Sequence, residues 1–217
     1  MEKWAVFDID GTLFPPSSME KRFILFMLKK GAIPLPNIAA YFFTGMLKTL
    51  SEGYEEGFKN NKYYLRHLPV ITVSKTAANF VKNQVWPQIS ATGLQRISEY
   101  RAKNYKILLM SGSPDFLTFP LAKFIQPDFT IAAELETRHD RFTGNLANLH
   151  PYGKRKSQLL LNFQATYKIN FKHSVVYANH QADFHHMSMF HTAVAINPSP
   201  KLKTLAERHH WKIEKWR

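Results

Sequence analysis

The chain has 217 residues, of which 45% are hydrophobic and 14% aromatic, enough for one ordinary domain or for one domain with a modest insertion. Its cysteine count is zero, which excludes a disulfide framework, a thiolate metal site and a cysteine nucleophile. Any metal must therefore bind to oxygen or imidazole ligands. The first residues lack the layout of a cleavable secretory signal, so we expect a cytoplasmic protein.

The formal net charge of +13 favours anionic partners such as phosphate esters, nucleic acids or acidic lipid surfaces. The sequence has no block of five like charges, no aromatic RNA-binding signature and no zinc-finger spacing, so we expect no nucleic-acid partner. Lys29 and Lys30 interrupt the most apolar stretch, 23–50, which argues against a transmembrane helix. Peripheral contact with acidic membrane lipid is a further hypothesis for this stretch.

A short strand followed by a helical block opens the chain. The apolar run at 4–7 predicts a buried strand at about 3–8, and helical spacing then predicts helices near 19–30, 37–51, 53–66 and 73–85. We therefore expect a separate small subdomain after the first strand. Aromatic residues spaced as core positions are Phe23, Phe26, Tyr41, Phe42 and Phe43. An alternative is that part of this aromatic set covers an apolar phosphoester.

From residue 89 onward, strands alternate with helices. Predicted strands are 107–110, 129–134, 174–178 and 192–196, predicted helices are 89–103, 115–125, 154–165 and 200–209, and 135–146 is a predicted hairpin. Because nearly every strand residue is apolar, the pattern predicts an α/β fold with a doubly wound parallel sheet. Ligands bind outside the carboxyl ends of the strands in such sheets, where Asp8, Ser111 and Asn179 fall.

Two aspartates, Asp8 and Asp10, follow the first strand, and Gly11 beside them allows a sharp turn. Two acids at one rim of a sheet need a counter-charge, which a hard cation such as Mg²⁺ supplies through oxygen ligands. An aspartate can also attack phosphorus directly while a second carboxyl group passes the proton. The alternative interpretation is an Asx turn that closes the strand.

Ser111, Gly112 and Lys154 carry chemistry only in combination with these acids. The Ser111 hydroxyl and the Gly112 amide could donate to phosphoryl oxygens, although Ser-Gly-Ser-Pro is also an ordinary turn. Lys154 opens a helix and could place its ammonium on a phosphoryl group, and the two basic residues after it compete for that role.

Asn179 and Asp183 lie four residues apart beyond the strand at 174–178 and could bind a metal or support its ligands. Three histidines follow, His185, His186 and His191. Adjacent residues on a helix point apart, and no acid is spaced to join them, so we predict packing or surface roles for these histidines rather than a metal site.

Taken in chain order, these pieces resemble the haloacid dehalogenase superfamily of phosphohydrolases over nearly the whole chain. The segments 109–114, 142–144 and 195–198 look more narrowly like subfamily IB, the group of phosphoserine phosphatase. The four motif positions that carry the resemblance are Asp8-Ile9-Asp10-Gly11-Thr12, Ser111, Lys154 and Asn179 to Asp183.

The resemblance implies a core formed by 1–14 and 88–217 and a helical cap of the C1 type at 15–87. It implies that Asp8 is the nucleophile and a Mg²⁺ ligand, and that Asp10 is the general acid and base and also contributes to the metal site. The remaining implied roles are phosphoryl binding by Gly11, Ser111, Gly112 and Lys154, and metal binding by Asn179 and Asp183.

The fourth motif departs from the subfamily pattern Tyr-Gly-Asp-Ser-x-x-Asp, because Asn179 stands where a metal-binding carboxylate is expected. An amide oxygen can coordinate Mg²⁺ but lacks the negative charge, so we expect weaker metal binding. The leading hypothesis is a Mg²⁺-dependent phosphatase that acts on a small phosphorylated metabolite. The alternative is a catalytically impaired protein that binds phosphate ligands. Glu20 is displaced from the position expected to read a substrate ammonium, so phosphoserine is not the expected substrate.

Overall fold

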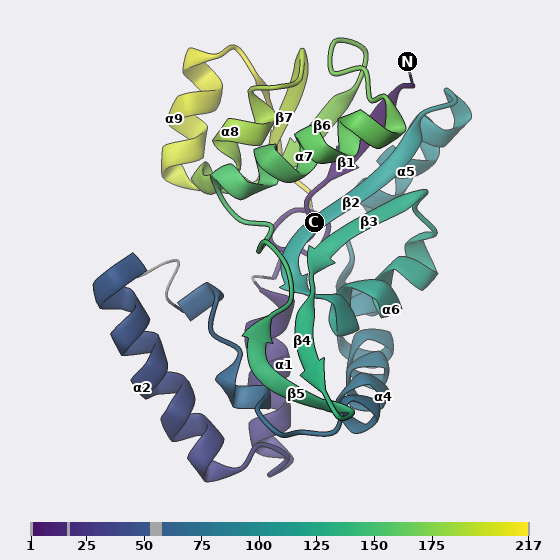
Figure 1. Ribbon diagram of the computed structural model, residues 1–217. Coiled ribbons are helices and arrows are strands. Elements are labelled where there is room, and N and C mark those ends of the chain that lie inside the picture. Colours follow the sequence, from purple (N-terminus) through teal and green to yellow (C-terminus); the bar gives the residue numbers. More distant parts are fainter. Residues whose placement is uncertain (1, 17, 53–57, 217) are drawn as a thin grey trace.

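The computed structural model describes residues 2–16, 18–52 and 58–216. Its centre is a parallel sheet of six strands in the order β3-β2-β1-β6-β7-β8 (Figure 1). The prediction of an α/β fold with a doubly wound parallel sheet is confirmed. The strands are β1 (Trp4–Phe7), β2 (Lys106–Pro114), β3 (Phe129–Ala133), β6 (Val175–Ala178), β7 (Thr192–Ile196) and β8 (Lys212–Glu214).

Helices cover both faces of this sheet, which explains why the central strands are apolar throughout. On one face, Trp4 and Val6 of β1 pack with residues of three helices, α7 (Lys154–Tyr167), α8 (Phe184–Met187) and α9 (Pro200–Arg208). On the other face, Ala5 and Phe7 belong to the core that includes α5 (Ala91–Ala102) and α6 (Asp115–Ile125). Alternate residues of one strand thus stabilise two separate layers.

A helical segment lies between β1 and β2 and extends away from the sheet (Figure 1). It contains α1 (Met19–Lys29), α2 (Leu35–Glu52) and α4 (Val70–Phe80), followed by a π-helical turn (Val81–Val85) and a 3-10 turn (Trp86–Gln88). Of the helix predicted at 53–66, residues 53–57 lie outside the described part of the chain. Residues 60–62 are not helical and Tyr63–Leu65 form a 3-10 turn, so the prediction is wrong there.

The reason is that the backbone of this stretch forms hydrogen bonds to a β-hairpin instead of the internal hydrogen bonds of a helix. The hairpin joins β4 (Leu135–Arg138) to β5 (Arg141–Leu146), and the amides of Lys62 and His67 donate to carbonyls of β5 at 3.1 and 2.8 Å. In return, the Phe142 amide donates to the Leu68 carbonyl at 3.1 Å. These bonds attach the helical segment to the hairpin.

Two details of the sheet and core differ from the sequence prediction. β8, which is short and charged, was not predicted; it joins the sheet through backbone pairing with β7. Phe42 and Phe43 of α2 are exposed rather than in the core, whereas Phe23 is buried and Phe26 and Tyr41 are half-buried. The core prediction therefore fails for the outward face of α2.

Candidate active site

Side chains from distant parts of the chain meet at the carboxyl edge of the sheet and surround a cavity of about 320 Å³. Asp8 follows β1 and Asn179 follows β6, and both line the cavity, as do four more of the predicted site residues: Asp10, Gly11, Gly112 and Asp183. Two predicted residues do not line it. Ser111 is fully buried within β2, and Lys154 is exposed at the start of α7.

Lys156, not Lys154, supplies the buried ammonium of the cavity. Its Nζ lies 2.7 Å from Asp8 Oδ1 and 2.8 Å from Asp183 Oδ1. The placement of Lys154 beside Asp8 is therefore corrected. A sequence signal for the right lysine exists, because Lys156 lies four and seven residues before Leu160 and Phe163, the other buried residues of α7. Residues at this spacing share one helix face, and Lys154 does not have it.

Burial and pairing set the charges of this group. Burial raises the pKa of Asp8 to about 7, against the opposing effect of the Lys156 ammonium. Burial also acts on Asp183, but Lys156 outweighs it and holds the pKa of that carboxyl below its usual value. The two carboxylates in turn raise the pKa of Lys156 despite its burial. Of the two carboxylates, Asp8 is thus the one that takes up a proton more readily, and Asp183 is the one that stays ionised beside the ammonium.

Asp10 is held by three hydrogen bonds from two elements. Its Oδ1 accepts from the Met19 amide at the start of α1 at 2.6 Å, and its Oδ2 accepts from the hydroxyls of Ser111 at 2.9 Å and Ser113 at 2.7 Å. Burial raises the pKa of Asp10 even so. Sequence reasoning assigned no role to Ser113, although its place two residues after Ser111 puts both hydroxyls on one side of an extended chain.

The turn after β1 brings Asn179 close to the backbone. Gly11 has a φ of +83°, and a Cβ at this position would lie 2.0 Å from Asn179 Nδ2, so a side chain is excluded here. Thr12 Oγ1 donates to Asp8 Oδ2 at 3.0 Å and lies 3.5 Å from Asn179 Oδ1. The turn therefore holds the Asn179 amide beside Asp8.

The oxygens around Asp8 are the kind of ligand that Mg²⁺ accepts. Among the described residues, no group of three or more His, Cys, Asp or Glu side chains could hold a metal ion. Around Asp8, the reason is Asn179: its amide is neutral at the position where a carboxylate would be the third acid beside Asp8 and Asp10. Asp183 Oδ1 accepts from Lys156 and its Oδ2 accepts from the His180 amide at 3.3 Å. The donor set thus fits a hard cation, with reduced negative charge.

His150 is a buried residue of the cavity that sequence reasoning missed. Its Nδ1 has no hydrogen-bond partner, and a Cβ on Gly112 would lie 2.9 Å from its Cε1. Burial lowers its pKa well below the ordinary value, as do four neighbouring cations, Lys62, Lys59, Arg155 and Lys156. A neutral imidazole among positive charges marks this wall as suited to an anion. No local pattern in the sequence distinguishes His150.

A second missed feature is a buried ion pair in the helical segment. Glu20 lines the cavity, and both of its oxygens lie 2.6 Å from the Nζ of Lys62, which is 1% exposed. The Tyr64 hydroxyl donates to Glu20 at 2.9 Å. The carboxylate is already neutralised, so it offers little attraction to a substrate ammonium.

The sequence model of the haloacid dehalogenase-like hydrolases matches residues 5–188. The chain belongs to this family. The matched range includes Asp8, Asp10, Lys156, Asn179 and Asp183, so the cavity lies within the part of the chain that the family model matches.

Among curated relatives, the hydrolase is similar to a histidinol-phosphatase of Neisseria meningitidis serogroup C, with 22% identity over 98% of both chains. It is also similar to a phosphoserine phosphatase of Mycobacterium tuberculosis, with 26% identity over 52% of this chain and 36% of that protein. Among solved structures, a Bordetella pertussis protein of unknown function has a TM-score of 0.83, 20% identity and 98% coverage of both chains. A phosphoserine phosphatase solved as a phospho-aspartyl intermediate analogue has a TM-score of 0.65, with 17% identity over 98% of this chain and 92% of that chain.

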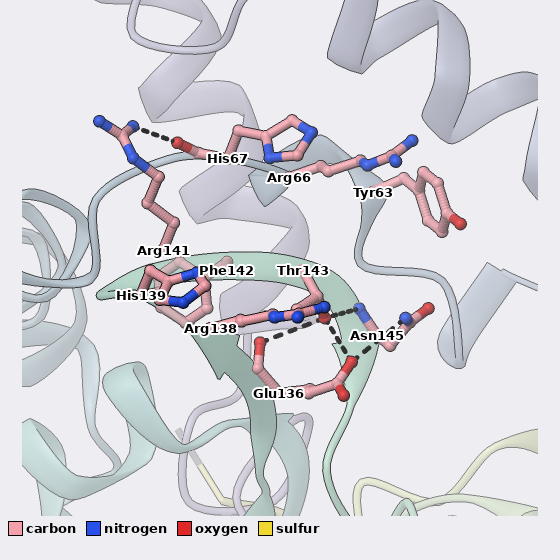
Figure 2. A pocket seen from close by; sticks show the side chains of 10 residues that line it. All are labelled: Tyr63, Arg66, His67, Glu136, Arg138, His139, Arg141, Phe142, Thr143 and Asn145. Atoms are coloured by element: carbon pink, nitrogen blue, oxygen red, sulfur yellow. Dashed lines mark hydrogen bonds between the residues drawn. The ribbon is translucent and has the colours of Figure 1, made fainter.

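The hydrolase has a second hollow, of about 550 Å³, between the turn after α2 and the β4–β5 hairpin (Figure 2). Three arginines line it, Arg66, Arg138 and Arg141. The acid in its lining, Glu136, accepts from the Thr143 hydroxyl at 2.6 Å and from the Asn145 amide at 3.3 Å. It shares no lining residue with the cavity around Asp8.

The histidines after the fourth motif of the hydrolase form no metal site among the described residues. His185 and His191 are exposed, and His186 is buried with its Nδ1 3.8 Å from Asp183 Oδ1. Burial lowers the pKa of His186 to about 3. The structure thus places His185 and His191 at the surface and His186 in the interior.

Proposed function

We propose that this hydrolase removes the phosphate group from a small phosphomonoester and that the phosphate passes through Asp8. The observation that carries the proposal is the buried contact of 2.7 Å between Asp8 and Lys156 at the floor of the cavity. A nucleophilic carboxylate needs a fixed cation beside it when a phosphate dianion approaches. The two relatives named as phosphatases support this reaction class.

The reaction then has two steps. In the first, an Asp8 oxygen attacks phosphorus, the bond from phosphorus to the ester oxygen breaks, and Asp10 gives its proton to the leaving alcohol. In the second, Asp10 takes a proton from water as the water oxygen attacks phosphorus and releases the Asp8 carboxylate. The burial that raises the pKa of Asp10 favours the protonated form that the first step needs.

The phosphoryl group is bound by the Gly112 backbone, the Gly11 turn and Lys156. Gly112 lines the cavity and has no side chain to keep an anion from its amide. Ser111, which does not line the cavity, donates its hydroxyl to Asp10 and so holds that carboxyl group instead of binding the phosphoryl group as first expected. Lys156 takes the role first expected of Lys154.

We propose that Mg²⁺ binds to the Asp8 carboxylate, the Asp10 backbone carbonyl and the Asn179 amide oxygen. When bound, the ion would neutralise charge on the phosphoryl group. We assign Asp183 to holding Lys156 rather than to the metal, because its Oδ1 accepts from the ammonium and its Oδ2 from the His180 amide. We do not adopt the non-catalytic alternative, because the chain retains the nucleophile, the acid and the ammonium.

We further propose that residues 15–87 act as a cap that selects the substrate. Glu20 and Ile24 of α1 and Tyr41 of α2 line the far wall of the cavity. Because Lys62 already neutralises Glu20, we expect phosphoserine to be a poor substrate.

The direct test is phosphate release from p-nitrophenyl phosphate and from a panel of metabolites that includes histidinol phosphate and phosphoserine, with Mg²⁺ present. We expect turnover by the wild type and a loss of about a thousandfold or more in Asp8→Asn. Asp140→Asn, an exposed change in the β4–β5 turn, is the matched control and should keep full activity. Equal release by wild type and Asp8→Asn would refute the proposal.

A further inference from the structure

The outward face of α2 is apolar along the described part of the helix. Six large side chains on it are between 51% and 86% exposed: Leu35, Phe42, Phe43, Met46, Leu47 and Leu50. A surface helix normally turns its charged side to water, so an exposed face of this kind marks an interaction surface.

Polar side chains on the inward face of α2 form hydrogen bonds with the rest of the protein. These bonds explain why the apolar face of the helix points outward. The Asn37 amide donates to the Arg66 carbonyl at 2.6 Å, and the Asn61 amide donates to Thr44 Oγ1 at 3.0 Å. A Cβ on Gly45 would lie 2.5 Å from the Phe58 ring, so the helix also needs glycine there to pack. These contacts fix the apolar residues on the outside.

Basic groups border this face at the start of α2. Lys29 and Lys30 are exposed at the end of α1, beside the exposed Leu25 and Leu28. The Asn37 side chain of α2 donates to the Arg66 carbonyl, and Arg66 also lines the basic hollow shown in Figure 2. This hydrogen bond connects the start of α2 to the hollow. The β4–β5 turn lies at the same end of the molecule as the start of α2 (Figure 1). Across residues 18–70 the sequence has eight Lys or Arg and four Glu.

We propose that the outward face of α2, with the basic groups beside it, docks on the surface of a lipid bilayer that contains anionic lipids. Apolar side chains would enter the boundary between headgroups and acyl chains, and the lysines and arginines would meet lipid phosphates. Within the described residues, no helix is both long and apolar enough to cross a bilayer. The contact is therefore peripheral.

Charge favours a lipid surface over a second copy of the chain. A symmetric dimer would pair this patch with the same patch of a second copy, which brings no excess of negative charge to the lysines. An anionic bilayer instead neutralises them. Because α1 and α2 also line the cavity around Asp8, docking would place that cavity close to the membrane surface. The docking itself does not depend on the proposed hydrolysis.

The test is co-sedimentation with sucrose-loaded vesicles of phosphatidylcholine with about 30% phosphatidylglycerol, and with pure phosphatidylcholine vesicles, at about 0.05 M salt. We expect the wild type to sediment with anionic vesicles and to be released at about 0.5 M salt. The triple variant Phe43→Gln, Met46→Gln, Leu50→Gln should lower the vesicle partition coefficient about tenfold or more. Ile71→Gln, an exposed apolar residue of α4, is the matched control and should not change it.

Circular dichroism and thermal unfolding of each variant show whether the fold is intact. The double variant Lys29→Gln, Lys30→Gln is an independent test, because it removes positive charge and leaves the apolar face unchanged. The proposal is overturned if the wild type stays in the supernatant with anionic vesicles, or if both sets of variants sediment as it does. Light scattering tests the alternative that a second copy of the chain covers this face. If the wild type forms a dimer that the triple variant abolishes, and the wild type does not bind vesicles, the face is a dimer interface.

Discussion

The Nζ of Lys156 lies 2.7 Å from Asp8 Oδ1 and 2.8 Å from Asp183 Oδ1, and all three side chains are buried. Without the ammonium, two buried carboxylates would face each other unpaired. We therefore predict that Lys156→Met lowers the free energy of unfolding by about 3 kcal/mol or more, and abolishes turnover at a temperature where the variant is still folded. Urea unfolding and phosphate release measure the two effects.

Lys154→Met is the control for this prediction, because Lys154 is exposed on the same helix. We expect it to change the free energy of unfolding by less than about 0.5 kcal/mol and to retain activity. If Lys154→Met abolished turnover and Lys156→Met did not, the assignment of the catalytic ammonium would revert to Lys154.

The second prediction concerns the charge of the metal site. Asn179→Asp replaces an amide by a carboxylate of the same shape beside Asp8, so we expect it to raise the affinity for Mg²⁺ about tenfold. Isothermal titration calorimetry with MgCl₂ measures the change, and Asn162→Asp, an exposed position of α7, controls for the added charge. Equal Mg²⁺ affinity in wild type and Asn179→Asp would show that Asn179 is not a ligand.

The sequence was sufficient for those parts of the site that follow directly from buried strands. The apolar run of β1 locates Asp8 and Asp10, and the strands β2 and β6 locate Gly112 and Asn179, because the carboxyl ends of parallel strands share one edge. The choice between Lys154 and Lys156 depends on which face of α7 meets the sheet. The spacing to the buried Leu160 and Phe163 contains that information, whereas a position at the start of the helix does not.

Other features depend on contacts between distant segments and have no local signal. β8 is three residues long and exists through its pairing with β7. The helix predicted at 53–66 fails where Lys62 bonds to the β5 hairpin. On α2, apolar spacing predicted a core face for Phe42 and Phe43, but a pattern of spacing cannot say whether the apolar side of a helix turns inward.

The third prediction concerns the buried imidazole of His150, which is surrounded by cations and lies beside Gly112. An anion in the cavity reverses the local potential, so it should raise the pKa of His150 and cause proton uptake at pH 6.5. Sulfate is a suitable probe because it remains a dianion at this pH. Calorimetry in two buffers of different ionisation enthalpy should show uptake by the wild type and less uptake by His150→Gln. Identical uptake by the two proteins would contradict a contact between His150 and the anion.

The fourth prediction concerns stability in acid. The pKa of His186 is about 3 in the folded protein, so between pH 5.5 and pH 4.5 the unfolded chain carries a proton here that the folded chain does not. Stability from this residue is therefore lost as pH falls, by about 1.4 kcal/mol per pH unit. His186→Leu should remove that part of the slope in urea unfolding, whereas His185→Leu, at an exposed position, should not. Asp8 contributes a slope of opposite sign, because its raised pKa lets the folded chain hold more protons, but all three proteins share that contribution. An unchanged slope in His186→Leu would mean that His186 is protonated in the folded state, as the partner of Asp183.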